Sequence, residues 1–153
     1  MENHTKVLPP EILLEEYRRL LQDEKIQSLP LVITGNSMSP FLVHGRDTVF
    51  LSRLDRDIKK GDILLYRRDS GAYILHRVYK AGEELTFVGD GQAAFERGIK
   101  RDRVIAVAES AVRKGKTIQK GCLVWDFFEK VWINFVPVRM PIIKIYSFLF
   151  HGK

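Results

Sequence analysis

The pattern of hydrophobic and polar positions divides the chain into three regions, and each region predicts a different kind of structure. In the first region, apolar side chains recur every three or four residues, with glutamate and arginine largely on the other side. These apolar residues are Ile12, Leu13, Tyr17, Leu20 and Leu21. The spacing predicts an amphipathic helix of about three turns. Pro9-Pro10 marks its start, because proline fits the first turn of a helix, and Pro30 ends the region.

The second region, from Leu31 to Ile118, consists of short apolar runs separated by glycine-bearing turns. The runs are rich in β-branched, aromatic and aliphatic residues, which favour strands. They cover residues 31–34, 48–52, 63–66, 73–79, 85–88 and 104–112. Turn residues such as Gly45-Arg46-Asp47 and Gly89-Asp90-Gly91 separate them. Several short strands with turns of this kind predict an antiparallel, mainly β core.

The third region, residues 121–153, is too apolar for a solvated tail. Its uncharged runs, such as residues 131–138, are bounded by Lys130 and Arg139 and fall short of the ~20 residues that span a bilayer. Pro137 and Pro141 are expected to break it into helical pieces. Two interpretations stay open. The tail is either an interfacial helix on an anionic bilayer, or a set of helices packed on the sheet or on a partner.

For the membrane interpretation, the sequence offers aromatic and basic side chains of the right kind. Trp125, Trp132 and Tyr146 would suit the headgroup boundary, where an amphipathic ring is favoured. Lys130, Arg139 and Lys144 would be attracted to anionic lipid, an effect that weakens as salt rises.

These three regions give a domain division. We expect an N-terminal helical segment at 1–29, a β domain at 30–120, and an apolar, basic helical tail at 121–153. The first 26 residues contain no apolar stretch that resembles a signal-peptide core. With no transmembrane segment recognised either, the chain is expected in the cytoplasm, or peripherally on the inner face of the membrane.

Composition narrows the classes of partner. The net charge of +6 favours anionic partners in general. The basic residues are scattered in short groups without interleaved aromatics, however, so we expect no nucleic-acid partner. One cysteine cannot form an intramolecular disulfide, and the four histidines are far apart, so no metal ion or other cofactor is expected.

The segment around Ser37 has the features of a nucleophile turn. A strand runs into Gly35-Asn36, which is followed by Ser37, and Pro40 then fixes the exit of the turn. A serine hydroxyl needs a base to take its proton before it can attack. A turn at a strand end can also leave backbone N–H groups free to bind an oxyanion.

Two further segments supply a base and an acid. His76 lies inside an apolar strand, where histidine is uncommon, and Asp90 lies in a glycine turn at the end of another strand. Taken alone, His76 would more often be a structural core or edge histidine, and Asp90 a turn residue. An unperturbed histidine has a pKa of ~6.5, so it is already mostly neutral at pH 7 and can accept a proton. Activity is accordingly expected to fall as pH drops through about 6.5.

In their order along the chain, these segments resemble the signal peptidase I family, which is related to the LexA-type self-cleaving repressors. The nucleophile box of the family reads Ser-Met-x-Pro with a following leucine. The four boxes match at Ser37-Met38-Ser39-Pro40 with Leu42, at Gly61-Asp62-Ile63, at His76-Arg77-Val78, and at Gly89-Asp90. The resemblance covers roughly residues 30–113, and the order of four boxes is more specific than any one box.

The resemblance implies a fold and a site. The fold is an antiparallel signal peptidase/LexA-like β-fold, flanked here by an N-terminal amphipathic helix and a C-terminal apolar helical tail. Ser37 would be the nucleophile and His76 the general base. A histidine base is typical of the endoplasmic-reticulum and SipW-like branch, whereas most bacterial members carry lysine. The box residues Met38, Pro40 and Leu42 would contribute to substrate binding.

Two supporting roles also follow from the resemblance. Many members carry a serine that assists the oxyanion hole at the position of Gly35, so here the hole would depend on backbone donors such as the Ser37 N–H. Asp90 would orient His76.

Three functions follow. The leading one is a serine endopeptidase that cleaves a leader- or signal-type peptide, with small side chains at the cleavage site, laid against a strand edge. The alternatives are a LexA-like self-cleaving regulatory domain and a catalytically inactive membrane-associated binding module. Self-cleavage is disfavoured because such repressors use a lysine base and an upstream Ala-Gly bond. The one Ala-Gly pair here, Ala81-Gly82, follows the proposed dyad.

Overall fold

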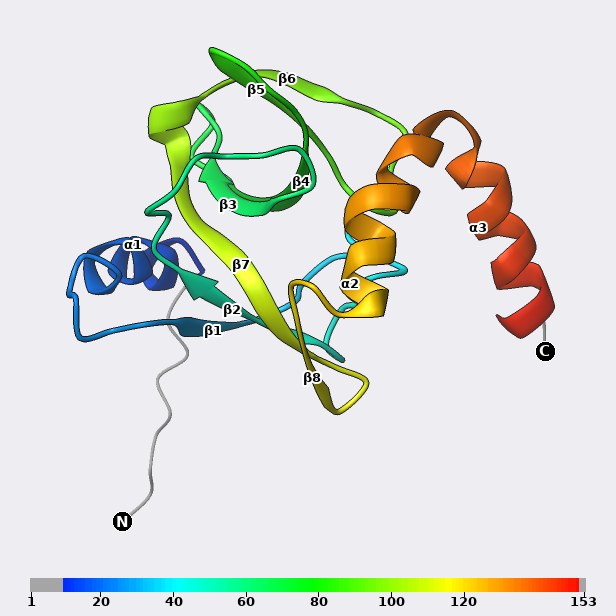
Figure 1. Cartoon of the computed structure of the whole chain (residues 1–153), viewed down its shortest axis with the longest axis horizontal. Helices are drawn as coiled ribbons and strands as arrows, with labels where there is room; N and C mark the ends of the chain where they lie inside the picture. The colour runs from blue at the N-terminus through cyan, green and yellow to red at the C-terminus, as the bar shows by residue number, and fades with distance from the viewer. Residues whose placement is uncertain (1–9, 152–153) are drawn as a thin grey trace.

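The computed structural model describes residues 10–151, so Pro9 and the rest of the expected segment before residue 10 lie outside the described residues. Helix α1, Pro10–Leu20, forms where the apolar spacing predicts it. Its buried face differs from the expected one. Leu14 on the helix and Leu21 just after it are buried, whereas Ile12 is 55% exposed. The helix lies beside β1 and β2 at one end of the molecule (Figure 1).

An antiparallel sheet forms the body of the protein, which confirms the mainly β class. The strands are β1 (Leu29–Val32), β2 (Thr48–Ser52), β3 (Ile63–Arg67), β4 (Tyr73–Ala81), β5 (Glu84–Val88), β6 (Glu96–Lys100), β7 (Val104–Arg113) and β8 (Lys116–Gln119). They form one sheet in the order β1-β2-β7-β3-β4-β5-β6, and β8 pairs with β7. The long strand β7 crosses the centre of the molecule (Figure 1).

Six of these strands lie where the sequence predicts them, and two do not. Strands β6 and β8 were not expected, because their sequences, ERGIK and KTIQ, are short and carry more charge than a buried strand. A 3-10 turn, η1 (Arg101–Arg103), joins β6 to β7.

Both faces of the central strands are buried. On β3, Ile63 and Leu65 belong to the larger hydrophobic cluster, while Leu64 and Tyr66 belong to a second cluster. Successive side chains on a strand point to opposite faces of the sheet. The two clusters therefore lie on opposite sides of β3, which explains why this strand reads as a continuous apolar run rather than an alternating one.

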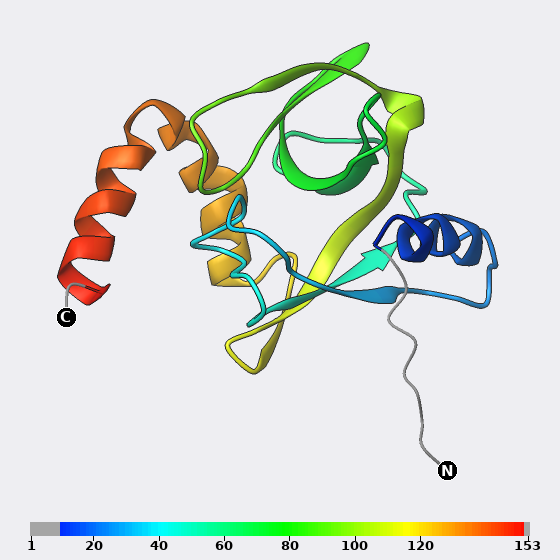
Figure 2. The ribbon, with the colours of Figure 1, turned by 180° about the vertical axis from the view of Figure 1, so that it is seen from behind.

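The C-terminal region is helical but not straight. Short helices α2 (Leu123–Asp126), η2 (Phe127–Val131, a π-helix) and η3 (Trp132–Phe135, a 3-10 helix) lead into α3 (Val136–His151). The expectation that prolines break the tail is wrong: the irregular turns precede Pro137, and Pro141 lies inside α3. Helix α3 stands on the far side of α2 from the sheet (Figures 1 and 2).

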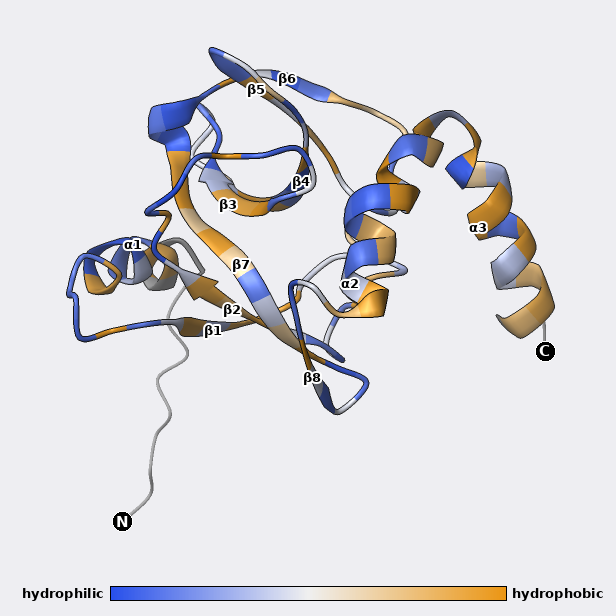
Figure 3. Cartoon of the chain, viewed as in Figure 1, coloured by the Kyte–Doolittle hydropathy of each residue, from blue (hydrophilic) through white to orange (hydrophobic). Residues whose placement is uncertain are grey.

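The two halves of the tail differ in burial. Trp125, Phe128 and Trp132 are part of the larger core cluster, so the first half of the tail packs on the sheet. The outer turns of α3 are apolar and exposed, as the hydropathy colours show (Figure 3). By length and composition, the stretch Leu123–Phe150 meets the criterion for a helix that could cross a membrane, and 17% of its most apolar window is buried. The sequence pattern alone did not reveal such a stretch.

Candidate active site

Ser37 lies in the loop that joins β1 to β2. Gly35 has a φ of +77°, in the left-handed region where glycine is favoured, and its N–H donates to His44 Nδ1 at 2.9 Å. The N–H of Ser39 donates to the Asn36 carbonyl oxygen at 3.1 Å. These bonds fold the loop tightly on both sides of Ser37. Gly35 thus shapes the turn, and its missing side chain leaves open space there.

A second loop, residues 89–92, packs directly against the Ser37 loop. The Gly91 N–H donates to the Ser37 carbonyl oxygen at 2.8 Å. A Cβ atom at Gly89 would overlap that same oxygen, and one at Gly91 would overlap the Ser39 carbonyl oxygen. Both glycines are therefore required by the close approach of two backbones, and the position of Ser37 depends on them.

Among the described residues, no hydrogen bond joins Asp90 to His76. The two carboxylate oxygens of Asp90 accept hydrogen bonds from Nε and Nη2 of Arg77, both at 2.8 Å, and neither side chain is exposed. Arg77 also donates to the Gly61 carbonyl oxygen at 2.8 Å. The expected role of Asp90, orienting His76, is thus replaced here by a buried ion pair that joins the loops at Gly61 and Asp90.

The C-terminal region fixes the same loop from outside. Trp132 Nε1 donates to the Asp90 carbonyl oxygen at 2.8 Å. Arg139, on α3, is fully buried and donates to the carbonyl oxygens of Gly89, Gln92 and Trp132 at 2.8, 3.1 and 3.0 Å. The membrane interpretation would have placed Trp125, Trp132 and Arg139 at the lipid, and the structure does not place them there. All three are buried, and two of them hold the loop behind Ser37.

His76 lies on β4, opposite Leu64 of β3, and is 4% exposed. Its Nδ1 is 3.5 Å from the Tyr66 hydroxyl. Burial lowers the pKa of His76 to about 4, and the nearby charge of Glu96 opposes this effect. The imidazole is therefore neutral at pH 7, as a proton acceptor must be.

Ser37 and His76 line the same cavity, whose volume is about 440 Å³. The walls come from α1, β1, the Ser37 loop, β3 and the first half of β4, and most of them are apolar. Within the described residues, no hydrogen bond joins Ser37 to His76. The fold thus brings the two expected catalytic residues to one cavity without a direct bond between them.

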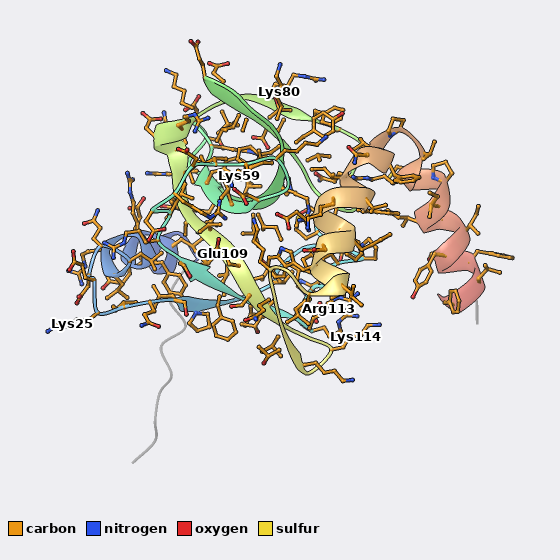
Figure 4. The ribbon with its side chains drawn as sticks, viewed as in Figure 1. Lys25, Lys59, Lys80, Glu109, Arg113 and Lys114 are labelled. Carbon is orange, nitrogen blue, oxygen red and sulfur yellow. The ribbon has the colours of Figure 1, made fainter. Side chains whose placement is uncertain are left out.

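The three residues expected to bind substrate lie in different surroundings. Met38 is 2% exposed and lines the cavity. Leu42 is fully buried in the larger core cluster and does not line the cavity, so it packs the core rather than contacting a substrate. Pro40 also lies off the cavity, and its carbonyl oxygen accepts a 3.3 Å bond from Arg113, at the outer end of β7 (Figure 4).

Two strand edges border the cavity. Strand β1 is the edge of the sheet and pairs with β2 alone. On β4, pairing with β5 begins at Arg77, so the stretch from Tyr73 to His76 is paired only with β3. The Tyr17 hydroxyl of α1 donates to the Pro30 carbonyl oxygen on β1. Backbone edges of this kind can pair with an added extended peptide.

Several residues of the site carried no sequence signal. The region around Ser37 and His76 is reached from β3, β6, η3 and α3 by Tyr66, Glu96, Trp132 and Arg139, and no motif links these residues.

Across residues 10–151, the structure holds no cluster of three or more His, Cys, Asp or Glu side chains that could bind a metal ion.

The arrangement has the elements of nucleophilic catalysis. A serine lies in a tight turn, and a neutral histidine lines the same cavity. In the part of the chain that the structure covers, the Ser37 N–H donates to no protein acceptor, so this N–H is available to an oxyanion.

Comparison of the sequence with protein-family models gives no match, and a search of curated proteins finds no similar sequence.

Proposed function

We propose that this chain is a serine endopeptidase of the signal peptidase I type, with Ser37 as nucleophile and His76 as general base. The observation that supports this most is the shared cavity: two residues from separate segments line one apolar space between two available strand edges. The order of four sequence boxes supports the same conclusion, and the antiparallel sheet is consistent with it. The finer fold, a signal peptidase/LexA-like sheet, is part of this proposal.

The reaction proceeds by acyl transfer. His76 takes the proton of the Ser37 hydroxyl as Oγ attacks the scissile carbonyl carbon, and the Ser37 N–H stabilises the resulting oxyanion. His76 then gives that proton to the leaving amine as the C–N bond breaks. A water molecule, deprotonated by His76, then attacks the acyl carbon. The bond from this carbon to Ser37 Oγ breaks, His76 returns the proton to Oγ, and the second peptide is released. Since apo hydrogen bonds between base and nucleophile are often long, substrate binding is expected to close the gap between Ser37 and His76.

The substrate binds as an extended strand between β1 and the first half of β4. Main-chain hydrogen bonds to the two edges supply affinity, and side chains of alternate residues enter the cavity. The aliphatic walls, which include Leu14, Leu65 and Ile74, favour an apolar side chain there. Small side chains beside the scissile bond are expected from the family resemblance. A leader- or signal-type peptide has this character.

Internally quenched peptides with small residues around a central bond provide the test. Ser37→Ala and His76→Ala are each expected to reduce cleavage by at least about 10³-fold, with the double variant little worse, because the residues act as a unit. The matched control is Ser39→Ala, two residues along the same loop, which is expected to keep wild-type turnover. His76→Lys should not rescue activity, because the amine of a flexible lysine side chain would not lie where the ring nitrogen of the imidazole does.

Wild-type cleavage by Ser37→Ala, or equal loss in Ser39→Ala, would contradict the assignment. Mass spectrometry of the incubated chain separates peptide cleavage from the self-cleaving alternative. Ala81 and Gly82 lie at the end of β4 and do not line the cavity. We therefore expect no intramolecular cut there. Cleavage of no peptide at all would favour the inactive binding module.

We also propose that the outer part of α3 binds a lipid bilayer, which would make the enzyme peripheral. Six large apolar side chains between residues 142 and 150 are at least 40% exposed. At 100° per residue they cover an arc of about 200°, wider than the stripe with which a helix packs on one protein face. Lys144 and Ser147 lie on the remaining arc.

The charges near α3 limit what lipid charge can add. Arg139 is buried, and Lys130 pairs with Asp126 at 2.7 Å. Lys144 is then the one exposed Lys or Arg on α3. Sedimentation with neutral and anionic vesicles is expected to show binding to both, with weak dependence on salt. Binding to neither would overturn the membrane proposal.

A further inference from the structure

The hydroxyl of Tyr66 lies between His76 and Glu96. Its oxygen is 3.5 Å from His76 Nδ1 and donates a 2.6 Å hydrogen bond to Glu96 Oε2. The Glu96 carboxylate is also held by Arg68, whose Nε and Nη2 donate at 2.7 and 2.8 Å. A line of polar groups therefore runs from the candidate base to an ionised acid, through one buried phenol.

The sheet builds this line from three strands. Strand β3 carries Tyr66, β4 carries His76 and β6 begins at Glu96. Because Leu64 pairs with His76, Tyr66 is the diagonal neighbour of His76 on the same face of the sheet. Tyr66 is fully buried, and its ring stacks on Phe87 with centroids 4.1 Å apart. The phenol is thus fixed in place by packing and does not depend on His76 for its position.

Counting hydrogens assigns the direction of each bond. A tyrosine hydroxyl has one hydrogen, and an ionised carboxylate can only accept. The bonds from Arg68 hold the pKa of Glu96 below its usual value, so the carboxylate is charged. Tyr66 therefore donates its one hydrogen to Glu96, so its oxygen can only accept a hydrogen bond from His76. A hydrogen bond between the two side chains therefore requires the proton on Nδ1 of the neutral imidazole, which leaves the lone pair on Nε2.

That tautomer is the one a general base at this position needs. A histidine base takes the nucleophile's proton on one ring nitrogen while the other is held by an acceptor. Asp90 does not fill this role among the described residues: its oxygens accept from Arg77, and no hydrogen bond joins them to His76. The charged groups that act on His76 are Glu96, Arg68 and Asp90.

We propose that Tyr66 is a positioning residue for His76, and that Glu96 stabilises the imidazolium through the Tyr66 hydroxyl. In the resting state Tyr66 accepts the Nδ1–H and directs the Nε2 lone pair into the cavity that Ser37 lines. When Nε2 takes the serine proton, the new positive charge is opposed by Glu96 across one hydroxyl. The kinetic part of this inference rests on the proposed peptidase function, whereas the tautomer does not.

Nitrogen NMR of ¹⁵N-histidine-labelled protein tests the tautomer without a substrate. His76 is expected as the Nδ1–H form at pH 7, although free imidazole side chains prefer Nε2–H. Tyr66→Phe keeps the ring and its stacking but removes the acceptor, so the Nε2–H form should appear. Glu96→Gln keeps an acceptor oxygen for the Tyr66 hydroxyl, so it should shift the tautomer less than Tyr66→Phe does. An Nε2–H form of His76 in the wild-type protein would overturn the inference.

Peptide cleavage by the same variants tests the catalytic consequence. Tyr66→Phe and Glu96→Gln are each expected to lower kcat at least about tenfold with little change in KM, but less than the ~10²–10⁴-fold that a general base contributes. The matched control is Tyr79→Phe on β4, whose ring packs on Phe95. It should retain wild-type kcat.

The two proposals can fail separately. Wild-type kcat in Tyr66→Phe, with Ser37→Ala inactive, contradicts the positioning role and leaves the peptidase assignment intact. An active Ser37→Ala contradicts the peptidase assignment, while the NMR result still decides the tautomer.

Discussion

The cavity around Ser37 and the outer surface of α3 are both apolar and open to solvent, yet they are built differently. The cavity takes its walls from a helix, three strands and a loop, and a serine and a histidine line it. On α3, the exposed side chains come from one helix. In Figure 4 the side chains of α3 reach outward from the rest of the molecule.

The two surfaces differ in whether they can fix the orientation of a bound molecule. The cavity combines apolar area with strand edges and polar groups at fixed positions, which together can orient one peptide bond. The α3 surface supplies area without hydrogen-bonding direction, which suits a fluid apolar phase. Between the two regions lies Arg139, which belongs to α3 but holds the loop behind Ser37. The C-terminal helix therefore begins as part of the site and ends as a separate surface.

The largest expected effect comes from breaking the buried ion pair between Arg77 and Asp90, near the cavity. Asp90→Ala leaves Arg77 buried without its partner, so the free energy of unfolding should fall by about 3–5 kcal/mol. Urea denaturation measures this. The matched control is Asp69→Ala, which removes an ion pair with Arg103 whose aspartate is 90% exposed and should leave the midpoint almost unchanged. Equal midpoints for the two variants would show that the buried pair does not hold the loops.

The next effect concerns the pH dependence of the base. With a pKa of about 4, His76 is neutral down to pH 5, so kcat/KM should stay nearly constant between pH 7 and pH 5. With a histidine of the ordinary pKa of ~6.5, kcat/KM would instead fall roughly 25-fold between pH 7 and pH 5. A rate that falls through pH 6.5 would contradict the burial effect, and one that rises only above pH ~8.5 would implicate lysine as the base.

The same shift makes folding pH-dependent, so both quantities must be measured. The pKa of His76 is lower in the folded chain than in the unfolded one, and the unfolded chain binds more protons between pH ~6.5 and 4. The stability contributed by neutral His76 is therefore complete above pH ~6.5 and is lost as pH falls towards 4. Circular dichroism at each pH separates unfolding from protonation of the base.

The sequence was sufficient to predict the helix and strands whose apolar residues recur at a regular spacing. The helix at α1 and six strands follow from apolar spacing, and strand β2 has its predicted bounds. Strands β6 and β8 were missed because pairing with β5 and β7, rather than their own composition, makes them strands. The hydrophobic pattern predicts a strand or helix that is stabilised by burial of its own side chains. It does not predict a strand that is stabilised mainly by pairing with a neighbouring strand.

The site was predictable to the same limited degree. The order of the boxes singled out Ser37 and His76, and both line one cavity. The partner of Asp90 was not predictable, because Arg77 and His76 are adjacent in sequence and only the face of β4 decides which one meets the acid. Tyr66 meets Glu96 through the register of distant strands, which a single sequence does not encode in any local pattern.

The smallest expected effect on folding and cleavage comes from changing the α3 surface alone. Ile145 and Leu149 are one helical turn apart, and they are 61% and 65% exposed. Replacing both with glutamate should reduce vesicle binding at least about tenfold, because charge disfavours entry into the apolar phase. Peptide cleavage without vesicles should not change, and the free energy of unfolding should stay within about 0.5 kcal/mol, as for most surface substitutions.

The matched control for this double variant is Ile12→Glu on α1. Its isoleucine is 55% exposed, so it adds a charge at a similarly exposed apolar position away from α3. It should sediment with vesicles as the wild type does. Equilibrium ultracentrifugation without lipid tests the other occupant of this surface. A wild-type dimer that the Ile145→Glu, Leu149→Glu variant abolishes would make the outer face of α3 a self-association surface. A wild-type monomer that binds vesicles supports the membrane as the occupant of this surface.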